Sequence, residues 1–368
     1  MGLLLSLVVI IVIGKCLGRF YARKWWQGLK VKVQYDRPEA MQDTEIEILE
    51  VLVNTSRLYL PYIYLKYDVS RNGEPINSRS GVFSLLFKQK VTRHIAYRCR
   101  RRGCYDIGKA YVVFKGIFLE DTLEYKVPQR SRLIVYPKLV DVSGVPIYCF
   151  MTEGDNIHNP RILEDRLAFR DIREYTDTDA MNRINWLATA RTDEFMVNTY
   201  DDMRRASVRI VLELPDSCFE ECEILQETDI SIAASIYVDM LRNKVPVSFV
   251  SNGLDAYTKG LVCLPERSDI GYEKEVLESF ARIGKLAKDG VADTRLEEGL
   301  MMHTTLILIS QVGDLGKGLT SSVFELVERG YKLLWIVVAG NRDTVSVDEA
   351  YNKIRKYGWD GRVQIYVW

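Results

Sequence analysis

The stretch from Arg173 to Tyr200 gathers side chains that bind ions and form hydrogen bonds, with aromatic residues among them. Arginine forms paired hydrogen bonds with carboxylates, whereas Tyr and Trp combine apolar surface with a polar edge. Such a set suits an active site, a nucleic-acid surface or a polar joint between two domains. We predict the joint. Its candidate ion-pair members are Arg170, Arg173, Arg183 and Arg191 with Asp171, Asp177 and Asp179.

The chain contains no recognisable catalytic set. The stretch "GDLGKGLTSS" does not follow the phosphate-loop order, because Lys317 precedes Gly318 instead of Ser or Thr. The three histidines are scattered, and the seven cysteines lack C-x-x-C spacing. No nucleophile and base are paired in a known motif. We therefore predict a protein that is not an enzyme, has no required cofactor and carries free thiols.

Four arginines lie close together in "YRCRRRGCY", namely Arg98, Arg100, Arg101 and Arg102. Nucleic-acid binding usually adds more basic surface and aromatic stacking, and the net charge of this chain is zero. We predict a solvated hairpin tip and no nucleic-acid partner. Attraction of this tip to an anionic membrane leaflet is the alternative.

Residues 30–140 have the pattern of an all-β domain. "LKVKVQY" and "TEIEILEVLVN" alternate apolar and polar residues, which is typical of half-buried strands. Asn-Gly in "RNGEP" indicates a tight turn. Several short strands at this spacing predict an antiparallel, Ig-like β-sandwich.

Residues 205–368 change to alternating apolar strands and amphipathic helices. "ASVRIVLEL", "VPVSFVS", "TTLILIS" and "YKLLWIVVAG" are predicted strands, and "SSVFELVERG" is a predicted helix that ends at Gly330. This alternation predicts an α/β domain with a parallel sheet. We predict that residues 141–204 form a linker segment that packs between the two domains.

The first 26 residues combine an uncharged run from Gly2 to Gly14 with aromatic and basic residues after it. A membrane-spanning helix needs about 20 apolar residues, so this run spans only if Lys15 reaches the interface. A cleaved signal peptide is the alternative, but no basic residue precedes the run. We predict an uncleaved transmembrane anchor over residues 1–26, in contact with the lipid bilayer. The positive-inside rule then predicts a single-pass protein of the cell membrane with a cytoplasmic C-terminal bulk.

One run of residues resembles a known family signature. The order R-x-Y-x-x-G-D-x-x-R-x-I-x-W-x-x-x-A-R characterises the domain-of-unknown-function family 58, and this chain has Thr178 in place of its Gly. The matching positions are Arg173, Tyr175, Asp179, Arg183, Ile184, Trp186, Ala190 and Arg191. "RRGCYDIG" and "LIVYPKL" also resemble strands of that family.

The resemblance implies a multi-domain α+β chain: a membrane anchor, a β-sandwich, the signature segment and a von Willebrand factor A-like, Rossmann-type α/β domain. It implies no enzymatic activity. Members are associated with MoxR-type AAA+ ATPases, so the resemblance implies such an ATPase and other membrane proteins as partners.

A von Willebrand factor A domain can bind Mg²⁺ through D-x-S-x-S after its first strand. In this chain Glu213 and Pro215 occupy two of the motif positions, and only Ser217 remains. A shifted site would use Asp216, Ser217 and Asp314, because hard cations bind converging oxygen ligands. A degenerate site without metal is the favoured interpretation.

These observations predict a non-enzymatic, membrane-anchored scaffold protein. It would work with a MoxR-type AAA+ ATPase in the assembly or maturation of a membrane or envelope complex. A Mg²⁺-dependent ligand-binding module on the α/β domain is the alternative hypothesis.

Overall fold

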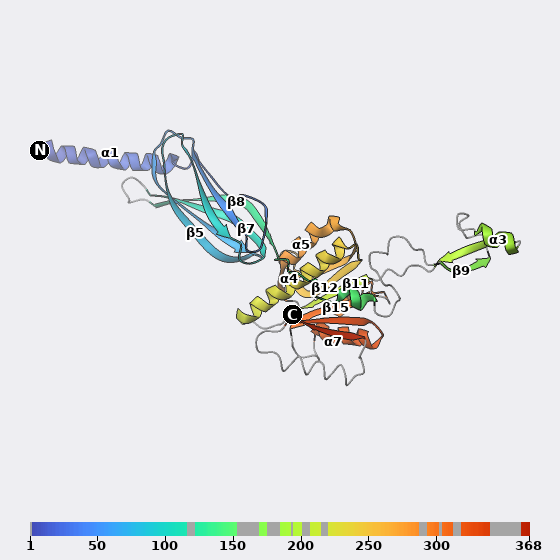
Figure 1. The fold of residues 1–368 in the computed structure, drawn as a ribbon. Helices are drawn as coiled ribbons and strands as arrows, with labels where there is room; N and C mark the ends of the chain where they lie inside the picture. The colour runs from blue at the N-terminus through green and yellow to red at the C-terminus, as the bar shows by residue number, and fades with distance from the viewer. Residues whose placement is uncertain are drawn as a thin grey trace.

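The computed structural model comprises two large sheet-based units and one small hairpin unit (Figure 1). It describes residues 2–115, 122–152, 169–174, 185–192, 194–200, 207–214, 220–286, 293–301, 304–311, 318–338 and 362–368. We call residues 29–136 the β unit, residues 207–368 the α/β unit, and residues 169–200 the hairpin unit.

The β unit consists of two sheets. A three-stranded antiparallel sheet has the order β1–β3–β6, and a five-stranded sheet has the order β2–β8–β7–β4–β5, in which β2 is parallel to β8. The strands are β1 (Leu29–Tyr35), β2 (Glu39–Met41), β3 (Glu45–Asn54), β4 (Leu60–Arg71), β5 (Glu74–Leu85), β6 (Lys90–Arg98), β7 (Gly103–Lys115) and β8 (Thr122–Tyr136).

Alternation of side chains builds the core between these sheets. In β1 every second side chain is buried, as the sequence predicts: Leu29, Val31, Val33 and Tyr35. The lysines between them are exposed. The predicted Asn-Gly turn joins β4 to β5, with φ of 54° at Asn72 and 83° at Gly73. Side chains of β8 close the free edge of β1, because Gln129 Oε1 accepts from Val33 N (2.9 Å) and Ser131 Oγ accepts from Tyr35 N (3.0 Å).

The α/β unit has a seven-stranded sheet of order β13–β12–β11–β15–β16–β17, with β14 also paired to β12. Five neighbouring strands are parallel, namely β12, β11, β15, β16 and β17. Strands β13 and β14 pair antiparallel with β12. The strands are β11 (Ser207–Glu213), β12 (Val247–Asp255), β13 (Leu261–Arg267), β14 (Ile283–Leu286), β15 (Thr304–Gln311), β16 (Lys332–Val338) and β17 (Val363–Val367).

Helices cover both faces of this sheet, which explains why β11, β15 and β16 are almost continuously buried. One face packs against α4 (Glu220–Arg242), α5 (Glu273–Arg282) and α2 (Ile147–Thr152). The other face packs against α6 (Asp293–Leu296) and α7 (Gly318–Glu328). Gly330 has a φ of 108°, and its N–H donates to Val327 O, so the predicted end of this helix is confirmed.

The first helix, α1 (Gly2–Lys24), corrects the prediction for the N-terminus. Among the helices of the described residues, none is long and apolar enough to cross a membrane. The predicted fold class was therefore wrong, because it included a transmembrane helix, and the chain is a mixed α/β structure. The predicted single-pass membrane localisation is overturned by the same finding. The physical reason is that the uncharged run ends at Gly14, and Lys15, Arg19 and Arg23 follow within the same helix.

One buried carboxylate lies between α4 and the sheet. Asp229 has no exposed surface, and its Oδ2 accepts a hydrogen bond from Gln311 Nε2 at the end of β15 (3.0 Å). Among the described residues, its other oxygen has no hydrogen-bond partner. Burial raises the pKa of Asp229 to about 8, and the bond from Gln311 opposes this rise.

We expect this carboxyl group to make stability depend on pH. The folded state holds the proton more tightly than the unfolded state, whose pKa is about 3.9. Stability should therefore be full below about pH 4 and should fall as pH rises toward the folded pKa of about 8. In chemical denaturation, Asp229→Asn should remove this decline and gain on the order of 2–4 kcal/mol at pH 8. Asp68→Asn, at an exposed position of β4, is the control. A pH profile unchanged by Asp229→Asn would contradict the assignment.

Candidate interaction site: the hairpin unit and the junction of the large units

The hairpin unit contains the signature-like segment. Its strands β9 (Phe169–Glu174) and β10 (Met196–Tyr200) pair antiparallel, and α3 (Trp186–Thr192) packs against β10. Asn185 caps the helix, because its Oδ1 accepts from Leu187 N (3.2 Å) and Ala188 N (3.1 Å). Two further bonds join α3 to β10: Asn185 N donates to Met196 O (2.8 Å), and Met196 N donates to Thr189 Oγ1 (3.0 Å).

Large apolar side chains of this unit face solvent. Trp186 is 67% exposed, Leu187 is 68% exposed and Phe195 is 57% exposed. The rings of Trp186 and Phe195 meet edge to face, with centroids 6.4 Å apart and planes at 82°. Figure 1 shows the unit away from both large sheets. The cap and the two hydrogen bonds to β10 fix the position of α3, which contains Trp186 and Leu187.

Of the eight positions that match the signature, the structure describes Arg173, Trp186, Ala190 and Arg191. Arg173 lies in β9 with its backbone opposite Val197, Trp186 begins α3, and Arg191 is exposed in the last turn of α3. Tyr175, Asp179 and Arg183 lie outside the described residues. The proposed role of this set as a joint between domains therefore stays a prediction.

The junction of the two large units depends on residues that the signature does not include. Arg102 precedes β7 of the β unit, and its side chain is only 6% exposed. Its Nε donates to Phe280 O (3.2 Å) and its Nη2 donates to Ile283 O (2.9 Å), at the C-terminal end of α5. Helix ends leave such carbonyl groups without partners and favour positive charge nearby. Arg102 thus caps a helix of the other unit.

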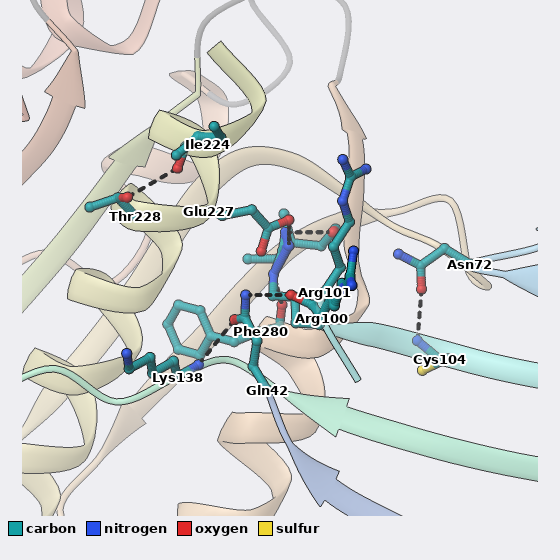
Figure 2. A network of polar contacts seen from close by, with 12 residues as sticks. Gln42, Asn72, Arg100, Arg101, Cys104, Lys138, Ile224, Glu227, Thr228 and Phe280 are labelled. Carbon is teal, nitrogen blue, oxygen red and sulfur yellow. Dashed lines mark hydrogen bonds and ion pairs between the residues drawn. The ribbon is translucent and has the colours of Figure 1, made fainter. Parts of the chain in front are cut away.

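A carboxylate completes the coordination of this guanidinium. Arg102 Nη1 donates to Glu227 Oε1 of α4 at 2.7 Å. Burial lowers the pKa of Arg102 from its ordinary value, whereas the charge of Glu227 opposes this change. Figure 2 shows the polar contacts of this junction, with Glu227 and Phe280 of the α/β unit labelled.

A hydrogen bond, a cation–π contact, an ion pair and an apolar seam surround this contact. Tyr257 Oη donates to Asp106 Oδ2 (2.6 Å), and Arg132 lies over the Tyr257 ring, 4.6 Å from its centroid. Lys274 Nζ is 2.5 Å from Glu39 Oε1. Apolar side chains from both units, Tyr136, Val238, Leu277 and Ala281, form the seam. The two large units are therefore joined by a built interface.

The predicted hairpin is wrong, because β6 and β7 belong to different sheets. Predicted solvation of the arginine cluster is wrong for Arg102, whereas Arg98, Arg100 and Arg101 are exposed. The backbone after Arg102 has an unusual conformation, because Gly103 has a φ of 138°. A Cβ at Gly103 would lie 3.0 Å from Arg71 Cγ. The Arg102-Gly103 pair was the sequence signal that could have singled out Arg102. Its acceptor carbonyl groups, however, belong to residues 280 and 283, far along the chain.

The predicted metal ligands Asp216, Ser217 and Asp314 lie outside the described residues. At the neighbouring carboxyl edge of the sheet, Glu213 Oε2 accepts from the backbone N–H of Thr320 (3.1 Å) and from its hydroxyl. Ser310 Oγ, on the adjacent strand, accepts from Trp335 Nε1 (2.9 Å). Protein donors thus contact both Glu213 Oε2 and Ser310 Oγ. No metal-ligating cluster occurs within the described residues. The metal-free interpretation and the alternative of a shifted Mg²⁺ site therefore both stay predictions.

Comparisons with known proteins do not identify a family. No family model and no curated protein matches the chain. The C-terminal domain of wzt is similar to 32% of this chain over 81% of its own length, at 11% identity and a TM-score of 0.25. A CARDB domain of the PF1109 protein from Pyrococcus furiosus covers 27% of this chain over 86% of its own, at 15% identity and a TM-score of 0.20. These scores are too low to establish a shared fold.

We expect Arg102→Met to weaken the junction, because Glu227 and Ile283 O would lose a buried donor, and Phe280 O would keep only the bond from the N–H of Ile283. The free energy of unfolding should fall by about 3 kcal/mol in chemical denaturation. Arg100→Met removes an exposed charge two residues away and should change stability by less than about 0.5 kcal/mol. Adding Glu227→Met to Arg102→Met should restore part of the loss. Equal effects of Arg102→Met and Arg100→Met would show that Arg102 does not secure the junction.

Proposed function

We propose that this chain is a non-enzymatic protein-interaction protein that presents the hairpin unit to a partner. The observation that carries the proposal is the solvent exposure of Trp186, Leu187 and Phe195. A side-chain cap and hydrogen bonds to β10 hold α3, the helix that contains the first two. Aromatic residues of this kind supply most of the binding energy at protein interfaces. Their exposure on one small unit therefore favours a protein partner over a small-molecule substrate.

The joined large units supply the second part of the proposal. Arg102, Glu227 and the α5 carbonyl groups tie the β unit to the α/β unit through buried bonds. A scaffold of two tied units presents its surfaces in a fixed relation, which reduces the entropy lost when a partner binds. This arrangement supports a role in holding or assembling other proteins.

The partner class that we propose is a MoxR-type AAA+ ATPase acting in the assembly or maturation of a larger complex. It rests on the resemblance of residues 173–191 to the family signature. An ATPase of this class changes conformation with its nucleotide, so its capture by this chain should differ with and without ATP.

Affinity purification of the full-length tagged chain from native extracts, with and without ATP, tests the proposal. Mass spectrometry should find an AAA+ ATPase whose recovery changes with nucleotide. The double variant Trp186→Ala/Phe195→Ala should lower that recovery at least about tenfold, because hot-spot aromatic residues each contribute roughly 2 kcal/mol or more.

Phe87→Ala provides the matched control, because Phe87 is 63% exposed on the β unit. This variant should capture the ATPase as well as the unmodified chain does. Undiminished capture by the double variant would exclude the hairpin face as the docking surface. Absence of any AAA+ ATPase from the captured proteins would contradict the proposed partner.

A further inference from the structure

Strand β5 forms a free edge of the β unit. It is the last strand of the five-stranded sheet and pairs on one side with β4. Within the described part of the chain, no strand pairs with its other side. Most of its residues from Glu74 to Ser80 are exposed. An edge strand of this length presents unpaired N–H and C=O groups that can bind a further strand.

Arg79 of β5 points toward the interior, on the same face as the buried Phe83 and Leu85. Its guanidinium lies over the ring of Tyr97 on β6, 5.2 Å from the ring centroid. Its Nε is buried and has no hydrogen-bond partner in the part of the chain that the structure describes. Within the described residues, Arg79 forms no salt bridge.

The neighbouring arginine shows what Arg79 lacks. Arg93 of β6 donates from Nε to Glu50 Oε2 (2.7 Å), and its Nη2 is 2.5 Å from the same oxygen. The other oxygen, Glu50 Oε1, accepts from Tyr67 Oη (2.8 Å). Both carboxylate oxygens of Glu50 are thus engaged by Arg93 and Tyr67.

We propose that the free edge of β5 binds an extended peptide segment whose carboxylate side chain lies opposite Arg79. In an antiparallel pair, directly opposed side chains share a face and have Cβ atoms about 4.5–5.5 Å apart. A Glu at that position would reach the unpartnered Nε of Arg79 from the side of the sheet that β4 leaves open. The inference concerns a different surface from the hairpin unit and does not depend on its function.

The surroundings of Arg79 also favour an acidic strand over an apolar one. An inward-pointing charge on an edge strand disfavours pairing with a strand that offers only apolar side chains. On the outer face of β5, Ser80 is exposed and Val82 is 57% exposed. Alternate side chains of the bound strand would lie beside Ser80 and Val82 on this outer face. Thr and Val suit such positions, because both are favoured in strands.

Isothermal titration of the full chain with a short blocked peptide of alternating Thr and Val, bearing one central Glu, tests the proposal. Its twin carries Gln in place of Glu. The Glu peptide should bind at least about tenfold more tightly, because a charge-assisted hydrogen bond replaces a neutral one. Hydrogen exchange should show new protection of the β5 backbone amides in the complex.

Substitutions on the protein isolate the role of Arg79. Arg79→Gln should abolish the preference for the Glu peptide, and Arg79→Glu should create a preference for a Lys peptide. Arg98→Gln removes an exposed arginine from β6, the next strand along the chain, and should leave the preference intact. Melting temperatures would verify that each variant folds. If a variant does not fold, the twin peptides and the exchange pattern of the unmodified chain still decide.

Equal affinity of the two peptides, protection that falls outside β5, or no binding at millimolar peptide would each overturn the proposal. Retention of the Glu preference by Arg79→Gln would do the same. Loss of the AAA+ interaction in the hairpin variants would leave these titrations unchanged, so the two surfaces can fail separately.

Discussion

The relation of the two large units depends on the burial of one guanidinium group, that of Arg102. A buried cation is costly unless its hydrogen bonds are satisfied and its charge is balanced. Both conditions are met only when the β unit and the α/β unit are together, because the acceptors are Phe280 O, Ile283 O and the carboxylate of Glu227. The helix end of α5 is satisfied by the same contact. Separation of the units would therefore leave groups on both sides without partners.

This constraint explains the arrangement of the surrounding residues. Helices α4 and α5 provide Glu227 and the capped carbonyl groups, and they also bury apolar side chains against the sheet and against Tyr136 of β8. The polar contact thus lies within an apolar seam, where the local dielectric strengthens it. The hairpin unit has a different character, since its large apolar side chains face solvent instead of another part of the chain. The two large units are thus joined by buried contacts, whereas the hairpin unit exposes its aromatic side chains.

Several local features were predictable from short stretches of sequence. The alternation in "LKVKVQY" predicted β1, the Asn-Gly pair predicted the β4–β5 turn, and Gly330 predicted the end of α7. Each depends on neighbours within a few residues. The prediction for the N-terminus failed, because a short uncharged run followed by cations was interpreted as a membrane-spanning helix. The signature positions Tyr175, Asp179 and Arg183 lie outside the described residues, so their role remains a prediction.

By itself, the sequence determined several of the strands and helices and where some of them end, because periodicity, turn residues and caps act locally. It did not predict β9, α3 and β10, which lie in the predicted linker. It could not separate Arg102 from Arg98, Arg100 and Arg101, since all four occur in one basic run. Only the tertiary structure decided that Arg102 is buried, because its partners are contributed by residues 227, 280 and 283. The same holds for Arg79 and Asp229, whose unpartnered atoms result from the packing of distant elements. Burial and charge compensation arise from contacts remote in sequence, so no local pattern encodes them.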